Sequence, residues 1–249
     1  MDEKIREQEP ALRDICTRFL ERFSGYGKEK GFVFTLNQDL FVERWCASDK
    51  TLIKIPGIGA HPDWFTARFT YPLQSEHWME LPDATRLEKN KKHFYSENWG
   101  SLGYVKLHGL YGWHGKYAMI IGKTKTEQIK DEPVINWWAE LFQQVLREAE
   151  NLVVIGYSFR DEHINEWILE RMQHGLRLHI INPKPMAEFR NSLVNLHGND
   201  PIPQPLSSQM SEIWEKLGPY YPHSVPDFFV KNHTNLTPEG ERFFDSLGL

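Results

Sequence analysis

The segment Asn151 to Asn165, NLVVIGYSFRDEHIN, limits most narrowly how this chain can fold. Leu152 to Ile155 is an unbroken aliphatic run, which is typical of a parallel strand buried on both faces. Gly156 ends the strand, and Asp161 can cap a helix whose apolar residues recur three and four apart through Met172. A strand, a glycine turn and a helix start direct several N–H groups at one point, which suits a phosphate. A plain strand-loop-helix crossover has the same pattern, so both interpretations stay open at this stage.

A second strand is predicted at Phe32 to Leu36, and polar residues follow it at once. Asn37 and Asp39 lie at its carboxyl end, where ligands bind in open α/β sheets, and a helix is expected from about Leu40. Asparagine and aspartate are also ordinary turn and cap residues. The residues alone therefore leave a ligand site and a simple turn as alternatives.

Two more short strands end in the same way. Tyr104 to Leu107 delivers His108, whose unperturbed pKa near 6.5 suits a proton acceptor at neutral pH, and Gly109 leaves room beside it for a substrate. Leu176 to Ile181 ends at Asn182, with a proline directly after it. A lone histidine is more often structural than catalytic, so position at a strand end is what favours His108 over other histidines.

Amphipathic helices separate these strands. Their apolar faces predict helices at residues 2–24, 132–149, 186–193 and about 211–217. Strands alternating with helices indicate an α/β fold with a Rossmann-like, mostly parallel sheet. We expect the sheet domain to comprise residues 1–50 and 100–200, with a small inserted lobe at 51–99 and a C-terminal wrapping or interface segment at 201–249.

Composition excludes several classes of protein. The net charge of −5 gives no sign of a nucleic-acid-coating surface, and no apolar run is long enough to span a membrane. Cys16 and Cys46 are the only cysteines, which excludes a disulfide framework and a four-cysteine zinc site and fits a reducing cytoplasm. The histidines are too scattered to predict a metal site, and His114 is expected to lie in a hairpin turn outside the functional site.

Four short motifs occur in the order found in one known family. They are FTLNQDLFVE from Phe34, KLHG from Lys106, GYSFRDEHIN from Gly156 and IINP from Ile180. Together they resemble the sirtuin-like NAD-hydrolase domains of bacterial defence proteins. Four motifs in order, across roughly residues 30 to 185, make the resemblance specific where each alone would not.

The resemblance implies a function and a set of site residues. NAD would be the substrate, split into nicotinamide and ADP-ribose, with no metal. Asn37, Asp39 and His108 would be catalytic. Cofactor-binding roles would fall to five residues: Thr35, Gly156, Tyr157, Ser158 and Asn182. The cysteine-based zinc ribbon of ordinary sirtuins has no counterpart, so protein deacylation ranks lowest.

One departure from the family pattern matters for activity. Such domains open with a strand and a glycine-rich loop that binds pyrophosphate, and neither Gly25–Gly27 nor Gly57–Ala60 is expected to follow a strand and precede a helix. The site would then be completed by a partner or by oligomerisation, or the chain would be a fragment. The alternative is a silent subunit of a defence complex that binds NAD or ADP-ribose or acts as a scaffold.

Overall fold

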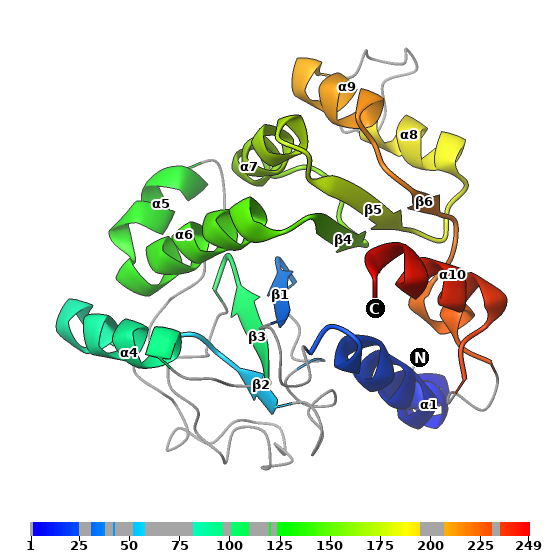
Figure 1. Ribbon diagram of the computed structural model, residues 1–249, viewed down its shortest axis with the longest axis horizontal. Helices are drawn as coiled ribbons and strands as arrows, with labels where there is room; N and C mark the ends of the chain where they lie inside the picture. Colours follow the sequence, from blue (N-terminus) through cyan, green and yellow to red (C-terminus); the bar gives the residue numbers. More distant parts are fainter. Residues whose placement is uncertain are drawn as a thin grey trace. The chain divides into compact units, whose positions relative to one another are not determined.

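A computed structural model of the chain describes residues 2–24, 31–37, 42, 52–57, 82–96, 101–109, 120, 124–194, 207–230 and 235–249. The elements in chain order are α1 (Asp2–Glu21), β1 (Gly31–Thr35), β2 (Leu52–Lys54), α4 (Ala84–Ser96), β3 (Ser101–Lys106), α5 (Lys125–Asp131), α6 (Pro133–Glu148), β4 (Asn151–Ile155), α7 (Glu162–Gln173), β5 (Arg177–Ile181), α8 (Met186–Val194), α9 (Ser208–Glu215), β6 (Tyr220–Tyr221), the 3₁₀ helix η2 (Val225–Phe228) and α10 (Pro238–Leu247). The predicted α/β class is confirmed, with short parallel sheets and helices between strands (Figure 1). The chain divides into two units, Met1–Phe142 and Gln143–Leu249, which are described separately.

The first unit contains a parallel sheet in the order β1-β3-β2 (Figure 1). Its central strand β3 is buried on both faces, with Leu102 and Val105 at 0% exposure and Tyr104 at 1%. Full burial explains why this strand has no polar alternation, because both of its faces meet apolar neighbours. The buried central strand therefore holds the residues that follow its carboxyl end in a fixed position.

Aromatic side chains attach the helices of this unit to its strands. Phe142 of α6 meets Phe34 of β1 edge-on at 4.8 Å between ring centroids. Trp138 of α6 is 1% exposed, and its indole N–H donates to the carbonyl of Pro56 at 2.9 Å. A buried indole needs such a partner, so α6 is held in one register against the segment after β2.

The range predicted as an inserted lobe, residues 51–99, includes the strand β2 and the helix α4. β2 pairs with β3 and so belongs to the sheet. A strand of three residues is too short to show a period, which is why the sequence did not predict it. The inserted lobe remains a prediction, since residues 58–81 lie outside the described residues, as does the helix expected from Leu40.

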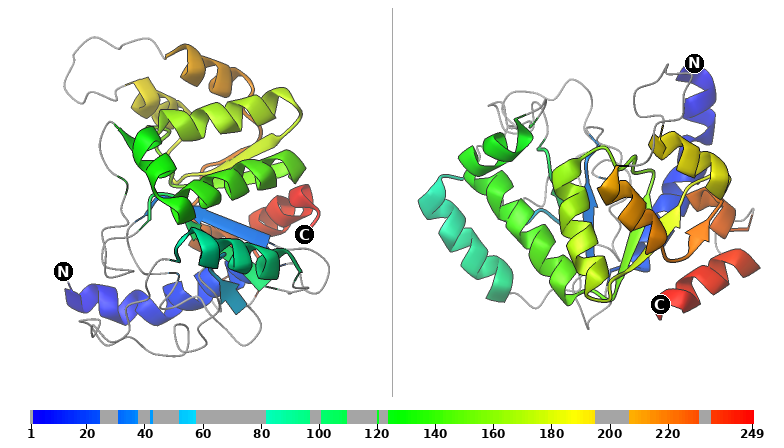
Figure 2. Two further views of the ribbon diagram at one scale, coloured as in Figure 1. Left: turned by 90° about the vertical axis from the view of Figure 1, so that its left-hand side faces the viewer. Right: turned by 90° about the horizontal axis from the view of Figure 1, so that it is seen from above.

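The second unit contains a parallel sheet in the order β4-β5-β6. α7 connects β4 to β5, and α9 lies beside α7, as Figure 2 shows. Gln173 of α7 donates to the carboxylate of Glu212 on α9 at 2.7 Å. The helix predicted near residue 211 therefore exists, but it starts at Ser208 because the Ser207 side chain accepts from the Met210 N–H and caps it.

The C-terminal segment packs onto this second sheet through its aromatic residues. Phe228 and Phe243 are both 0% exposed, and their rings stack at 4.9 Å. Tyr221 of β6 meets Phe243 edge-on at 5.0 Å, and its hydroxyl lies 3.1 Å from the Ser246 hydroxyl. The described aromatic side chains of the tail thus belong to the core of this unit. The described parts of the chain include no helix with the length and hydrophobicity needed to cross a membrane.

Candidate functional site

The carboxyl ends of β1 and β3 meet at one edge of the first sheet. Thr35 lies opposite Lys106 in the parallel register, and the Leu107 N–H donates to the Thr35 carbonyl at 3.0 Å. Asn37 follows Thr35 by two residues, and His108 follows Lys106 by two. The structure therefore brings three of the predicted residues, Thr35, Asn37 and His108, to the same edge.

Two hydrogen bonds hold the backbone of Asn37, and neither of them involves its side chain. The Asn37 N–H donates to the Thr35 hydroxyl oxygen at 3.0 Å, and the Lys106 ammonium donates to the Asn37 carbonyl at 3.0 Å. Lys106 is 1% exposed, and its ammonium also lies 5.5 Å from the ring centroid of Tyr104. Asn37 itself is exposed. A rigid backbone with an exposed amide suits a residue that orients a substrate or a water.

His108 is buried, with 5% of its surface exposed. A tight turn follows it, in which the Gly109 N–H donates to the Lys106 carbonyl at 2.9 Å and Gly109 has φ of +65°. The His108 carbonyl accepts from the Ile120 N–H at 2.8 Å. Glycine is needed here because side chains rarely tolerate this φ. The imidazole is thus held at the strand end, away from bulk water.

Asp39, the third predicted catalytic residue, lies outside the described residues, and so does His114. Among the described residues there is no group of three or more side chains that could hold a metal ion. β2 ends three residues before Gly57, so a strand does precede this glycine, but residues 58–60 lie outside the described residues and the expectation for Gly57–Ala60 stays a prediction. Gly57 itself is buried, and the Asn90 amide donates to its carbonyl. Gly57 has no open space beside it, because a Cβ there would lie 2.5 Å from the Trp137 ring.

The carboxyl ends of β4 and β5 form a second edge, in the second unit. Ile155 lies opposite Ile181, so Gly156 and Asn182 begin adjacent loops. Gly156 has φ of +64°, is exposed, and a Cβ there would meet nothing within 4 Å. Ser158 is also exposed. The backbone angle at residue 156 favours glycine, and the space beside it is open.

The Tyr157 hydroxyl ties the loop after β4 to the helix α7. The hydroxyl donates to the Asn165 amide oxygen at 2.9 Å and also lies 3.2 Å from the Asp161 carbonyl. Burial, and next the negative charge of Asp161, raise the pKa of Tyr157 well above its usual range, so the hydroxyl remains a donor. Asp161 occupies the predicted N-cap position of α7, but its side chain makes no capping hydrogen bond.

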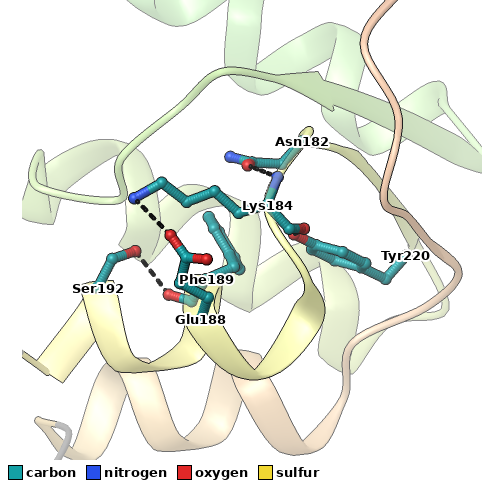
Figure 3. A network of polar contacts seen from close by, with 6 residues as sticks. All are labelled: Asn182, Lys184, Glu188, Phe189, Ser192 and Tyr220. Carbon is teal, nitrogen blue, oxygen red and sulfur yellow. Dashed lines mark hydrogen bonds and ion pairs between the residues drawn. The ribbon is translucent and has the colours of Figure 1, made fainter. Parts of the chain in front are cut away.

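Asn182 closes the turn after β5, as Figure 3 shows. Its amide oxygen accepts from the Lys184 N–H at 3.0 Å, and its own N–H donates to the Tyr221 carbonyl at 3.1 Å. The Tyr220 hydroxyl donates to the Lys184 carbonyl at 2.6 Å, and the Lys184 ammonium lies 3.6 Å from the Glu188 carboxylate. The turn is thus tied to both α8 and β6, and its oxygen is already engaged.

The parallel sheets and their crossover helices define a Rossmann-like α/β class of protein. The family model described as SIR2-like domain matches residues 31–202, more than two thirds of the 249 residues. The chain belongs to the SIR2-like family. None of the curated proteins compared with the chain matches it.

Two structural residues near the strand ends were not singled out from the sequence. Lys106 lies inside a buried strand and Asn165 inside a helix, and both are 1% exposed. The available signal was chemical: a lysine in an otherwise apolar strand and an asparagine on the apolar side of a helix need partners when buried. Lys106 finds its partner in the segment after β1, and Asn165 finds its partners in the loop before α7; periodicity cannot identify either pairing.

Proposed function

We propose that this chain is an NAD hydrolase that splits NAD⁺ into nicotinamide and ADP-ribose. The observation that carries this proposal is the meeting of Asn37 and His108 at the carboxyl ends of two paired parallel strands. SIR2-like domains bind NAD, so a ribose-orienting amide beside a buried imidazole has an evident substrate.

Cleavage of the bond between nicotinamide and ribose needs little general acid catalysis from the protein. Nicotinamide leaves as a neutral molecule because the electrons of the broken C1′–N bond neutralise the pyridinium, and the ribose passes through an oxocarbenium-like state. A water oxygen then forms the new bond at C1′ and loses a proton. Asn37 would orient that water or the ribose, and His108 would accept the proton. Asp39 would hold the carboxamide of nicotinamide.

The second edge supplies the groups suited to the ADP-ribose half. Exposed Ser158 and the N–H groups after Gly156 would bind phosphate oxygens. Thr35 would contact NAD at the first edge, beside Asn37. Asp161 and Glu162 bring carboxylates to the start of α7, so hydrogen bonds rather than charge would have to attract the phosphates there. The oxygen of the Asn182 amide closes its turn, and its amide nitrogen would meet the adenosine ribose.

An enzyme that destroys NAD is harmful when constantly active. Because the motifs resemble those of bacterial defence proteins, we propose that the chain acts in an anti-phage defence system of the bacterial cytoplasm. It would stay inactive until oligomerisation or a partner protein activates it. The alternative is a catalytically silent subunit that binds NAD or ADP-ribose or scaffolds such a complex. Asn182, Ser158 and the loop after Gly156 would serve both functions equally, whereas a buried His108 beside Asn37 favours the enzyme.

One product analysis distinguishes the NAD hydrolase from the silent binding subunit. NAD⁺ is incubated with the purified chain over a range of protein concentrations, and products are resolved by proton NMR. The enzyme yields nicotinamide and ADP-ribose in equal amounts. Saturable NAD binding with no nicotinamide in any assembled state would support the silent subunit instead.

A further inference from the structure

Asn165 is placed to control the shape of the loop between β4 and α7. It lies in the first turns of α7, is 1% exposed, and reaches back to the loop with both ends of its amide. Its oxygen accepts from the Tyr157 hydroxyl at 2.9 Å, and its nitrogen donates to the Phe159 carbonyl at 2.9 Å. One side chain thus holds two residues of the loop that carries Ser158.

The loop needs such support because its backbone is strained. Phe159 has φ of +54°, the only described non-glycine residue with positive φ. That conformation is unfavourable for a residue with a side chain and persists only where surrounding contacts enforce it. The Phe159 ring is 2% exposed, 4.6 Å from the Tyr157 ring and 6.2 Å from the Phe189 ring of α8. The ring anchors the residue, and the Asn165 bond to its carbonyl sets the backbone angle.

The chemistry of the clamp requires a carboxamide. An amide offers an acceptor and a donor in one plane, whereas a carboxylate lacks the donor that the Phe159 carbonyl needs, and leucine lacks both. Truncation would leave a buried carbonyl and hydroxyl without these bonds, so the loop would move to satisfy them with water. Ser158 lies between the two clamped residues and would move with them.

We infer that Asn165 is a positioning residue that holds the Gly156–Phe159 loop in its ligand-binding shape through Tyr157 and Phe159. The inference rests on the proposed function, because it assumes that this loop binds the ADP-ribose half of NAD. Asn165 touches no ligand itself. Its effect is on the fraction of molecules whose loop is ready to bind.

The test compares variants of the full chain in ADP-ribose affinity by calorimetry and in hydrogen exchange of residues 157–161. If Asn165→Ala leaves the loop in its binding shape a tenth of the time, the dissociation constant rises about tenfold. Asn165→Asp keeps the acceptor for Tyr157 and should lose affinity too. Tyr157→Phe removes the hydroxyl contacts with the Asn165 oxygen and the Asp161 carbonyl but leaves the Asn165 bond to the Phe159 carbonyl, so it should lose less. All three should exchange faster across the loop. Gln173→Ala, an exposed amide on the same helix that bonds to α9, is the matched control and should match wild type.

The results of these variants decide whether Asn165 positions the loop. Slow loop exchange and wild-type affinity in Asn165→Ala or Asn165→Asp would overturn the inference while leaving the proposed function intact. A wild-type chain that binds neither NAD nor ADP-ribose would overturn both. Should Asn165→Ala not fold, Tyr157→Phe alone must still show faster exchange and weaker binding, and its failure to do so would equally overturn the inference.

Discussion

Among the residues that the structure describes, Asn37 takes part in the fold through its backbone. Its N–H and carbonyl are bonded to Thr35 and Lys106, while its side chain is exposed at the strand end. Asn37→Ala should therefore leave the melting temperature unchanged and lower nicotinamide release by about 10²-fold, because an unoriented nucleophile loses the benefit of fixed geometry. Initial rates at saturating NAD⁺ measure this. Release at the wild-type rate would remove Asn37 from the mechanism.

Ser158 is exposed and should affect binding without affecting stability. Loss of a phosphate contact in Ser158→Ala should weaken ADP-ribose binding by about 1–3 kcal/mol, since a hydrogen bond to a charged group falls in that range. Ser208→Ala, an exposed serine at the start of α9, provides the control. Equal affinity of the Ser158 and Ser208 variants would show that the loop does not use its hydroxyl.

At the scale of residues, the sequence predicted the candidate site residues at the strand ends. It did not predict the buried polar residues that hydrogen-bond to the backbone near them. Asn37, His108 and Asn182 could be found because each directly follows a short apolar run. Lys106 and Asn165 could not, because their importance depends on hydrogen bonds to the Asn37 and Phe159 carbonyls, which form only in the folded backbone. Neither partner is visible in any local pattern.

Among the elements, the link between β2 and the helices of the first unit depends on a glycine. A Cβ on Gly57 would lie 2.5 Å from the Trp137 ring, and its φ is +81°. Gly57→Ala should lower the free energy of unfolding by the strain of that angle plus about 1–3 kcal/mol of overpacking. Gly175, with φ of +102° and nothing within 4 Å of a Cβ, is the control that carries strain alone. Denaturant melts should separate the two alanine variants by the overpacking term; coincident melts would contradict this.

The second sheet contains a buried histidine that should make its stability depend on pH. His179 of β5 is 0% exposed, bonded to the Asn151 amide oxygen at 3.0 Å and stacked on Tyr221. Burial, and next the positive charge of Arg177, lower the pKa of His179. The unfolded chain then binds the proton more tightly than the native one, so this contribution is complete above about pH 6.5 and is lost as pH falls toward the lowered folded pKa.

His179→Gln tests this effect, because glutamine can still donate to Asn151 but does not titrate. Between pH 7.5 and 5, the free energy of unfolding should fall more for wild type than for the variant. Identical slopes would show that another group is responsible.

The sequence predicted long periodic elements better than short ones. α6 and β4 were predicted within a residue or two because their apolar patterns are unambiguous. β2, α5 and β6 have two to seven residues and were missed, since their pairing or packing depends on segments distant in the chain. The helix α10 begins with a Thr237 cap and Pro238, signals present in the sequence but overlooked among the aromatic residues of the tail.

For the whole molecule, the proposed activation predicts a dependence on assembly. The tail aromatics Phe228 and Phe243 are buried, so their exposure does not drive association. If oligomerisation completes the active enzyme, nicotinamide release per chain should rise with protein concentration, in parallel with the mass measured by light scattering. Constant activity per chain from a monomer at every concentration would reject activation by self-association.

The role of His108 as the base is the central claim, and one measurement tests it most directly. Nicotinamide release is compared between wild type and His108→Gln, which is similar in size but cannot take up the proton at neutral pH. Release should fall by about 10²- to 10⁴-fold, while the affinity for ADP-ribose stays within a few-fold, because a general base contributes to the reaction rather than to binding. His174→Ala, an exposed histidine at the end of α7, should behave as wild type. Undiminished release by His108→Gln would contradict the mechanism.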